Sequence, residues 1–184
     1  MAMPIAVPRY TLDDLESFPD DGNRYELLDG MLLVSPAPRP AHELVVQRLH
    51  YELVTYLGRR ARVFTRGAVQ LRPRTSLEPD LLVLPAAEPI RREWADIAGW
   101  WLAVEVSGRG SRIYDRDFKQ TAYPRLGVKE AWRADLAEHC VYVVRERDGP
   151  VTRVEERLLW HPSGLGEPLN LDLAELFQDV DDDW

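Results

Sequence analysis

Hydrophobic residues recur every three or four positions in the segment 41–58, which predicts an amphipathic helix that ends at Gly58. The apolar positions of this helix are Leu44, Val45, Leu49, Leu53, Val54 and Leu57. Two shorter helices are predicted: one at 12–18, which follows Thr11 as its N-cap, and one at 171–177. The long helix is the element that the pattern predicts most strongly.

A further helix is predicted over 111–127, where turn and capping residues enclose a mixed polar and apolar stretch. Ser111 or Asp115 is the expected N-cap, and Gly127 is the expected stop. Pro124 lacks a backbone N–H, so it should distort or shorten the last turn of this helix.

Apolar runs and alternating patterns predict strands in the remaining chain. Asp29 and Gly30 form a typical short turn between two strands, so 24–36 is expected to be a hairpin. Further strands are expected at 63–71, with a bend at Gly67, and at 79–85, 100–107, 128–135, 139–147 and 151–160. This order of elements favours an α/β fold with a mixed sheet flanked by helices on both faces.

Length and charge restrict the class of protein. A chain of 184 residues with 45% hydrophobic content is expected to form a single domain, with an acidic tail at 179–184. Asp and Glu total 31 against 23 Lys and Arg, a formal charge of −8, so binding a polyanion would require a local basic patch or a metal. Cys140 is the single cysteine, which excludes an internal disulfide. With no predicted membrane span and no export signal, a cytoplasmic location is expected.

Acidic side chains stand among apolar neighbours at the ends of two predicted strands. Asp80 precedes the apolar run 81–84, and Glu105 lies between Val104 and Val106. If the two strands pair, the carboxylates meet, and they repel each other unless a cation lies between them. Oxygen ligands of this kind, completed by water, are typical of a magnesium or manganese site.

Two more charged residues are candidates for the same site. Lys119 follows Glu105 by 14 positions, enough for a return from strand to helix over the strand end, and Glu26 lies on a short predicted strand. A metal that binds a phosphate oxygen, beside a lysine that orients or deprotonates the attacking water, suits hydrolysis of a phosphodiester. Taken alone, Asp80 is more simply a solvated acid at a strand end or a turn cap, Glu26 could face water, and Lys119 is an ordinary surface charge. The apolar neighbours of Glu105 imply burial, which is rare for a glutamate without a partner.

Five segments resemble, in order and spacing, the Uma-type putative restriction endonuclease family of the PD-(D/E)XK nuclease superfamily. They are "RYELLDGMLLVSPAPRPAHELVVQRL", "EPDLLVL", "WWLAVEVSGRGS", "YDRDFKQTAYPRLGVKEAW" and "LDLAELF". The resemblance covers about residues 10–178, and it implies a restriction-endonuclease-like fold and Mg²⁺- or Mn²⁺-dependent cleavage of DNA. It also implies a homodimer, because cutting both strands at once needs two sites.

The resemblance also implies roles for individual residues. The catalytic residues are Asp80, Glu105, Lys119 and Glu26, and the metal ligands are Asp80, Glu105 and the main-chain carbonyl of Val106. The usual lysine position, two residues after the second acid, holds Ser107. In this family the lysine has typically moved to the following helix, which here carries Lys119.

Two further residues are possible auxiliaries. His42 could approach the site from the start of the long helix, although a surface histidine is favoured there because that end of the helix dipole opposes its charged form. Tyr123 lies four residues after Lys119, on the same helix face, so it could line the site or pack beside the lysine.

Departures from the family pattern leave other functions open. The segment 107–111 reads "SGRGS" where a serine-proline turn is usual, and Arg133 occupies a position where an apolar residue is expected. One alternative is a catalytically inactive module that keeps the fold and binds nucleic acid or a protein. Another is an unrelated acid-base enzyme acting on a small molecule, whose activity would survive EDTA.

Overall fold

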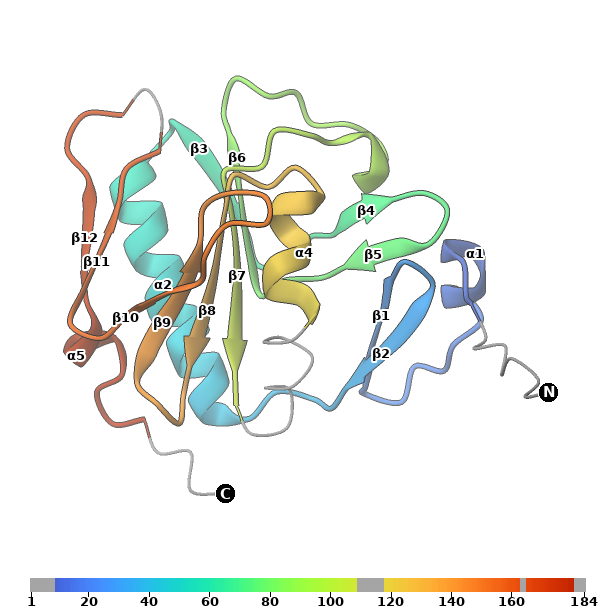
Figure 1. Cartoon of the computed structure of the whole chain (residues 1–184), viewed down its shortest axis with the longest axis horizontal. Helices are drawn as coiled ribbons and strands as arrows, with labels where there is room; N and C mark the ends of the chain where they lie inside the picture. Colours follow the sequence, from blue (N-terminus) through green and yellow to red (C-terminus); the bar gives the residue numbers. More distant parts are fainter. Residues whose placement is uncertain (1–8, 109–117, 163–164, 181–184) are drawn as a thin grey trace.

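The computed structural model describes residues 9–108, 118–162 and 165–180. These residues form three sheets, with helices packed against them (Figure 1). The largest sheet has six strands in the order β10-β9-β8-β7-β6-β3. Its strands are β3 (Ala61–Phe64), β6 (Leu81–Pro85), β7 (Leu102–Ser107), β8 (Glu130–Asp135), β9 (Cys140–Val144) and β10 (Thr152–Val154). Neighbours are antiparallel except β7 and β8, which are parallel, so the sheet is mixed.

Two smaller sheets and five helical segments of different lengths complete the described structure. A four-stranded sheet has the order β2-β1-β5-β4, and β11 pairs with β12. Their strands are β1 (Arg24–Leu28), β2 (Met31–Ser35), β4 (Val69–Leu71), β5 (Thr75–Leu77), β11 (Arg157–Trp160) and β12 (Leu169–Asp172). The helical segments are α1 (Leu12–Leu15), α2 (Pro40–Leu57), η1 (Trp94–Asp96), α4 (Gln120–Arg125) and α5 (Leu173–Leu176).

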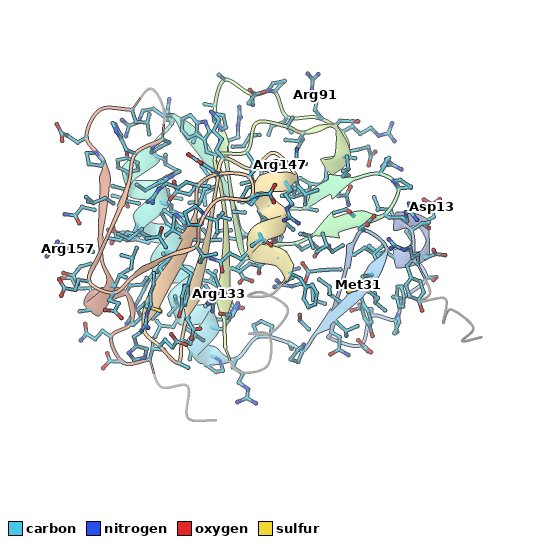
Figure 2. The ribbon with its side chains drawn as sticks, viewed as in Figure 1. Asp13, Met31, Arg91, Arg133, Arg147 and Arg157 are labelled. Carbon is cyan, nitrogen blue, oxygen red and sulfur yellow. The ribbon has the colours of Figure 1, made fainter. Side chains whose placement is uncertain are left out.

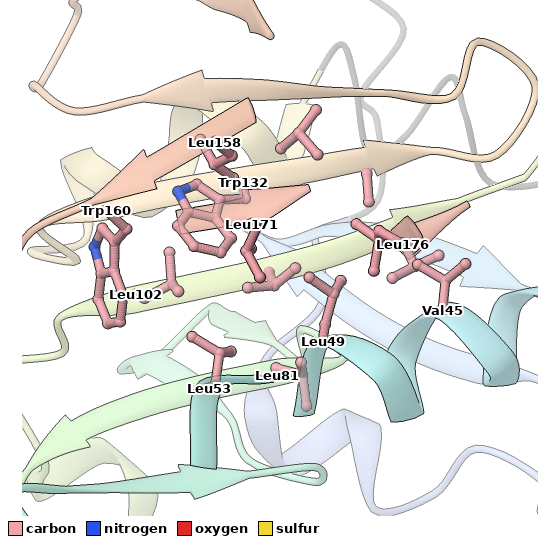
Figure 3. Close-up of a cluster of buried hydrophobic side chains, with 14 of the residues drawn as sticks. Val45, Leu49, Leu53, Leu81, Leu102, Trp132, Leu158, Trp160, Leu171 and Leu176 are labelled. Atoms are coloured by element: carbon pink, nitrogen blue, oxygen red, sulfur yellow. The ribbon is translucent and has the colours of Figure 1, made fainter. Parts of the chain in front are cut away.

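One face of the six-stranded sheet packs against α2. Val45, Leu49 and Leu53 of the helix are buried (Figure 3), and they belong to the same apolar cluster as Leu81 of β6 and Val104 of β7. The β11–β12 hairpin and α5 close this core at its far side (Figure 1). Burial of this continuous apolar surface is the main stabilising contribution on this side of the sheet.

Aromatic contacts join the hairpin to the sheet. The rings of Trp132 on β8 and Trp160 on β11 meet edge to face, with centroids 5.5 Å apart (Figure 3).

One of the apolar positions predicted for the long helix is wrong. Val54 is 42% exposed, whereas Val46, which the predicted apolar face omitted, is buried in the core beneath the helix.

The opposite face of the sheet packs against α4 and the four-stranded sheet. Leu82 and Ala103 alternate with the residues of the first core and contact a second cluster, which includes Leu33, Leu77 and Tyr123. Side chains along a strand alternate between its two faces. The strand positions that share this face with Leu82 and Ala103 therefore point toward α4 and the second sheet.

Several predicted boundaries change in three dimensions. The predicted strand 63–71 is two strands, β3 and β4, which belong to different sheets. The segment 151–160 likewise divides into β10 and β11, and 171–177 begins as the end of β12 before α5 starts. Periodicity shows where a strand can form, but it does not show which sheet the strand joins.

The described part of the helix predicted over 111–127 is helical at positions 118 and 119 and in α4. The helix α4 contains Pro124, close to its end as expected, and Gly127 follows with a positive φ of 90°. Ser111 and Asp115, the expected N-caps, lie outside the described residues. Lys119 stands at the N-cap position of α4.

The predicted class, a mixed α/β fold with helices on both faces of the sheet, is confirmed by this arrangement. None of the helices in the described ranges is long and apolar enough to cross a membrane.

Candidate active site

Strand register brings Asp80 and Glu105 together. Leu81 pairs with Val104 in the antiparallel β6–β7 ladder, so Asp80, one residue earlier, stands opposite Glu105, one residue later. Residues directly opposite in such a pair point to the same face, here the face that carries α4. Both side chains are buried, with Asp80 5% and Glu105 3% exposed. The two strands pair as the sequence prediction required, and their register places the two side chains opposite each other on one face of the sheet.

Three hydrogen-bond donors hold the Asp80 carboxylate. Its Oδ2 accepts from the backbone N–H of Val106 at 2.7 Å and lies 3.0 Å from Nε2 of His42, while Oδ1 accepts from Nη2 of Arg24 at 3.1 Å. Burial would raise the pKa of Asp80, but His42, Arg24 and the Val106 N–H outweigh it and lower the pKa to about 2. Asp80 is therefore an anion at neutral pH.

His42 is not the surface histidine that the sequence favoured. Its side chain is only 14% exposed and pairs with Asp80, because α2 begins beside the start of β6. Burial lowers the pKa of His42, but the hydrogen bond and the charge of Asp80 outweigh burial, so the net shift is upward. The unfavourable end of the helix dipole is thus offset by a buried carboxylate.

Lys119 lies between two acids. Its Nζ is 2.5 Å from Oε2 of Glu26 and 3.3 Å from Oε1 of Glu105, and the side chain is 1% exposed. The hydroxyl of Tyr123, one turn further along the same helix, donates to Oε1 of Glu105. The interpretation of Lys119 as an ordinary surface residue is therefore wrong, since a lysine this buried requires partners of opposite charge.

Glu26 reaches the site from the four-stranded sheet. It lies in the middle of β1 and is fully buried, and its Oε1 accepts from the backbone N–H of Glu78 at 2.8 Å. The alternative in which Glu26 faces water is therefore excluded. The site is formed where the two sheets meet, with α4 between them (Figure 1).

Arg24 is the member of the site that sequence reasoning missed. Its Nη1 donates to the carbonyl oxygen of Glu78 at 2.9 Å, next to the contact of Nη2 with Asp80. Burial alone would lower the pKa of Arg24, but Asp80, Glu105 and Glu26 raise it, so the guanidinium stays charged. One signal was present in the sequence: Arg24 precedes Glu26 by two positions, which places both side chains on one face of β1.

The donor set suits a hard divalent cation. Two carboxylates stand on adjacent strands, and the N–H of Val106 points to Asp80, so its carbonyl lies on the same side of β7. In the described part of the chain, no group of three or more His, Cys, Asp or Glu side chains is arranged to hold a metal. Mg²⁺ commonly binds through one or two carboxylates, with water and substrate phosphate completing its shell, so Asp80, Glu105 and Val106 fit such an ion.

The carboxylates are also neutralised from within the protein. Asp80 faces Arg24 and His42, and Glu105 shares Lys119 with Glu26. A divalent cation at this position would compete with these groups for the same oxygen atoms. Its binding therefore depends on how firmly the protein's own cations hold Asp80 and Glu105.

Comparison with known proteins places this arrangement in a family. A family model described as "Uma2: Putative restriction endonuclease" matches residues 12–178. Among solved structures, the chain is similar to a protein described as a putative nuclease belonging to DUF820 from Anabaena variabilis ATCC 29413, with a TM-score of 0.74 and 19% sequence identity. The match covers 91% of this chain and 97% of that one, and it shows the same fold. A search of curated proteins found no match. The chain belongs to the Uma2 family of putative restriction endonucleases.

Proposed function

We propose that the protein is a metal-dependent endonuclease that hydrolyses DNA phosphodiester bonds with metal-activated water. The observation that carries this proposal is the pairing of Asp80 with Glu105 across β6 and β7, with Lys119 buried beside them. Membership in a family of putative restriction endonucleases supports the same reaction class. Mg²⁺ or Mn²⁺ is the proposed cofactor, because the donors are all oxygen atoms.

Each residue has a proposed role that follows from its contacts. Asp80, Glu105 and the carbonyl of Val106 would bind the cation, which when bound supplies Lewis-acid stabilisation of the phosphate and lowers the pKa of a water molecule. The ammonium of Lys119 would orient the attacking water or stabilise negative charge as it develops on the phosphate. Glu26 would hold that ammonium in place through its 2.5 Å contact.

His42 and Tyr123 would be auxiliary residues that orient the two metal ligands. His42 contacts Oδ2 of Asp80, and Tyr123 donates to Oε1 of Glu105. A metal-ligating carboxylate is usually fixed by a second hydrogen bond of this kind. The proposal therefore assigns these two residues to ligand geometry rather than to the chemical step.

A homodimer with DNA as its partner is part of the proposal, because two sites are required to cut both strands at once. The net charge of −8 repels DNA at long range, so exposed arginines such as Arg72, Arg74, Arg91 and Arg92 would have to supply local attraction. Cys140 is a buried free thiol, which suits the reducing cytoplasm that we propose as its location.

Isothermal titration of Mg²⁺ and Mn²⁺ into the wild type and into an Asp80→Ala/Glu105→Ala variant tests the proposal, together with cleavage of plasmid DNA. We expect binding and cleavage in the wild type and the loss of both in the variant. A wild type that binds neither cation, with or without a non-cleavable oligonucleotide, and leaves the plasmid intact would contradict a metal-dependent nuclease.

A catalytically inactive module that binds nucleic acid or a protein partner is the second candidate. The observation that favours it is the internal neutralisation of the site, where Arg24, His42 and Lys119 already satisfy the carboxylates. Such a module would keep its stability unchanged in EDTA and would bind its partner without a divalent cation.

A further inference from the structure

Arg133 is a buried cation on the strand next to Glu105. It lies in β8 (Figure 2), is 1% exposed, and is the register partner of Glu105 in the parallel β7–β8 ladder. Ser107 and Asp135 are register partners two positions further along, and both are also buried. The four side chains therefore share the sheet face on which α4 lies.

A chain of hydrogen bonds runs from Arg133 to the start of α4. The Nη1 of Arg133 donates to Oδ2 of Asp135 at 2.6 Å and to Oγ of Ser107 at 3.1 Å, while its Nε donates to Oε1 of Gln120 at 3.4 Å. The centroid of the Tyr142 ring, on β9, lies 4.2 Å from the guanidinium carbon. Arg133 thus connects two strands of the sheet to the first residue of α4.

Asp135 is itself held in place. Its Oδ1 accepts from the backbone N–H groups of Ala137 and Glu138, both at 3.1 Å, in the turn after β8. The guanidinium of Arg133 is therefore fixed by a carboxylate that the turn has already oriented. Fold stability alone does not explain such a pair, since replacing a buried ion pair by apolar residues is often neutral or stabilising.

The helix that receives this contact is short, and positions 118 and 119 before it are π-helical. The helix α4 has six residues with Pro124 among them, and Lys119 at its N-cap position makes no side-chain capping bond. Gln120 directly follows Lys119 and is 3% exposed, with its amide oxygen directed to Arg133. A shift of Gln120 would therefore move the backbone that carries Lys119.

We propose that Arg133 is a positioning residue of the site: through Gln120 it fixes the first turn of α4 and so holds the Lys119 ammonium between Glu26 and Glu105. The catalytic consequence rests on the proposed function. The positioning itself is a property of the free protein, without metal or DNA, and can be tested independently.

The lysine content of the chain provides a direct measurement. Lys119 and Lys129 are the only lysines in the sequence, and Lys129 is exposed. In protein labelled with ¹³C at the lysine ε carbon, the two Hε protons of an immobilised lysine have separate shifts, whereas free rotation averages them. Lys129→Arg assigns the two signals, and Lys129 is the internal reference for a mobile side chain.

Gln120→Leu removes the acceptor of the Arg133 bond and leaves the Arg133–Asp135 pair intact. We expect the Hε splitting of Lys119 to collapse in this variant, and we expect kcat for DNA cleavage to fall by about 10- to 100-fold with KM within about twofold. Gln120→Glu retains an acceptor for Arg133 and should keep both properties close to the wild type. Arg125→Gln, which removes an exposed ion pair with Asp148 at the other end of α4, is the matched control and should change neither.

A Gln120→Leu protein whose Lys119 splitting equals that of the wild type would overturn the proposal. If Gln120→Leu does not fold, Gln120→Met, which preserves the length of the side chain, is judged by the same splitting. A wild type that cleaves no DNA would refute the proposed function, whereas the Lys119 spectrum would still decide whether Arg133 positions Lys119.

Discussion

The backbone N–H of Val106 donates a hydrogen bond of 2.7 Å to Oδ2 of Asp80, so the main chain of one strand fixes the carboxylate at the start of its neighbour. The position of Asp80 therefore depends on the register of β6 against β7. A shift of one residue would turn Glu105 to the opposite face of the sheet and separate the two acids. The fold and the proposed metal site share the same hydrogen-bonded ladder.

Arg24 should weaken metal binding, because its guanidinium lies 3.1 Å from Oδ1 of Asp80, a proposed metal ligand. We expect Arg24→Gln to bind Mn²⁺ about 1 kcal/mol more tightly, or roughly fivefold, by isothermal titration. Arg9→Gln, which removes an exposed ion pair with Asp29, is the control and should leave the affinity unchanged. Weaker binding in Arg24→Gln would mean that Arg24 orients Asp80 for the metal instead of competing with it.

Lys119→Met should destabilise the protein, because Glu26 and Glu105 would remain buried without their shared cation. We expect the free energy of unfolding in urea, measured in EDTA, to fall by about 3 to 5 kcal/mol. Adding Glu26→Gln removes one of the two buried charges and should restore part of this loss.

Cleavage separates this structural role of Lys119 from its proposed catalytic role. DNA cleavage should be lost in both Lys119→Met and the double variant, while Mn²⁺ binding is retained because the ligands are unchanged. Restored cleavage in the double variant would contradict a catalytic role for Lys119.

Tyr123→Phe removes the hydroxyl that donates to Glu105 and keeps the ring in the second core cluster. A hydrogen bond to a charged group contributes about 1.5 to 3 kcal/mol, so we expect a loss of this size in urea unfolding. Tyr51→Phe serves as the control, since the side chain of Tyr51 is 67% exposed, and should be neutral. Equal stabilities of the two variants would show that Glu105 is held without Tyr123.

His42→Gln should lower the free energy of unfolding more at acidic than at basic pH, in protein freed of metal with EDTA. The pKa of His42 is raised in the folded protein by Asp80. The ion pair of His42 with Asp80 therefore makes its full contribution to the free energy of unfolding below pH 6.5, the pKa of the histidine in the unfolded chain. This contribution is lost as the pH rises through the folded pKa. Glutamine can keep a hydrogen bond to Asp80 but carries no charge.

The measurement compares urea unfolding of the wild type and His42→Gln at pH 5.5 and pH 8.5. We expect the difference in unfolding free energy to be larger at pH 5.5. His50→Gln, on the same helix, provides the comparison for a general effect of losing a histidine. A His42→Gln difference that is independent of pH would show that the charge of His42 does not stabilise the fold.

Much of the site could be predicted from local pattern. Asp80 and Glu105 stood out because one precedes an apolar strand and the other lies within one, and a buried carboxylate requires a partner. Lys119 and Glu26 were added from chain order and from the resemblance to a family. Arg24 was missed because an arginine near the start of a short strand is ordinarily a solvated residue, and nothing local shows that β1 faces β6 and β7.

The apolar runs of β6 and β7 are a property of the sequence, and by themselves they indicated that both strands are buried and that Asp80 and Glu105 are charged residues among apolar neighbours. Only the tertiary structure decided that Glu26 lies in a second sheet and still reaches the site, that His42 is buried, and that Arg133 is linked to α4. The physical reason is that periodicity follows from backbone geometry within one element, whereas these contacts join residues that are far apart in the chain and depend on how separate elements pack.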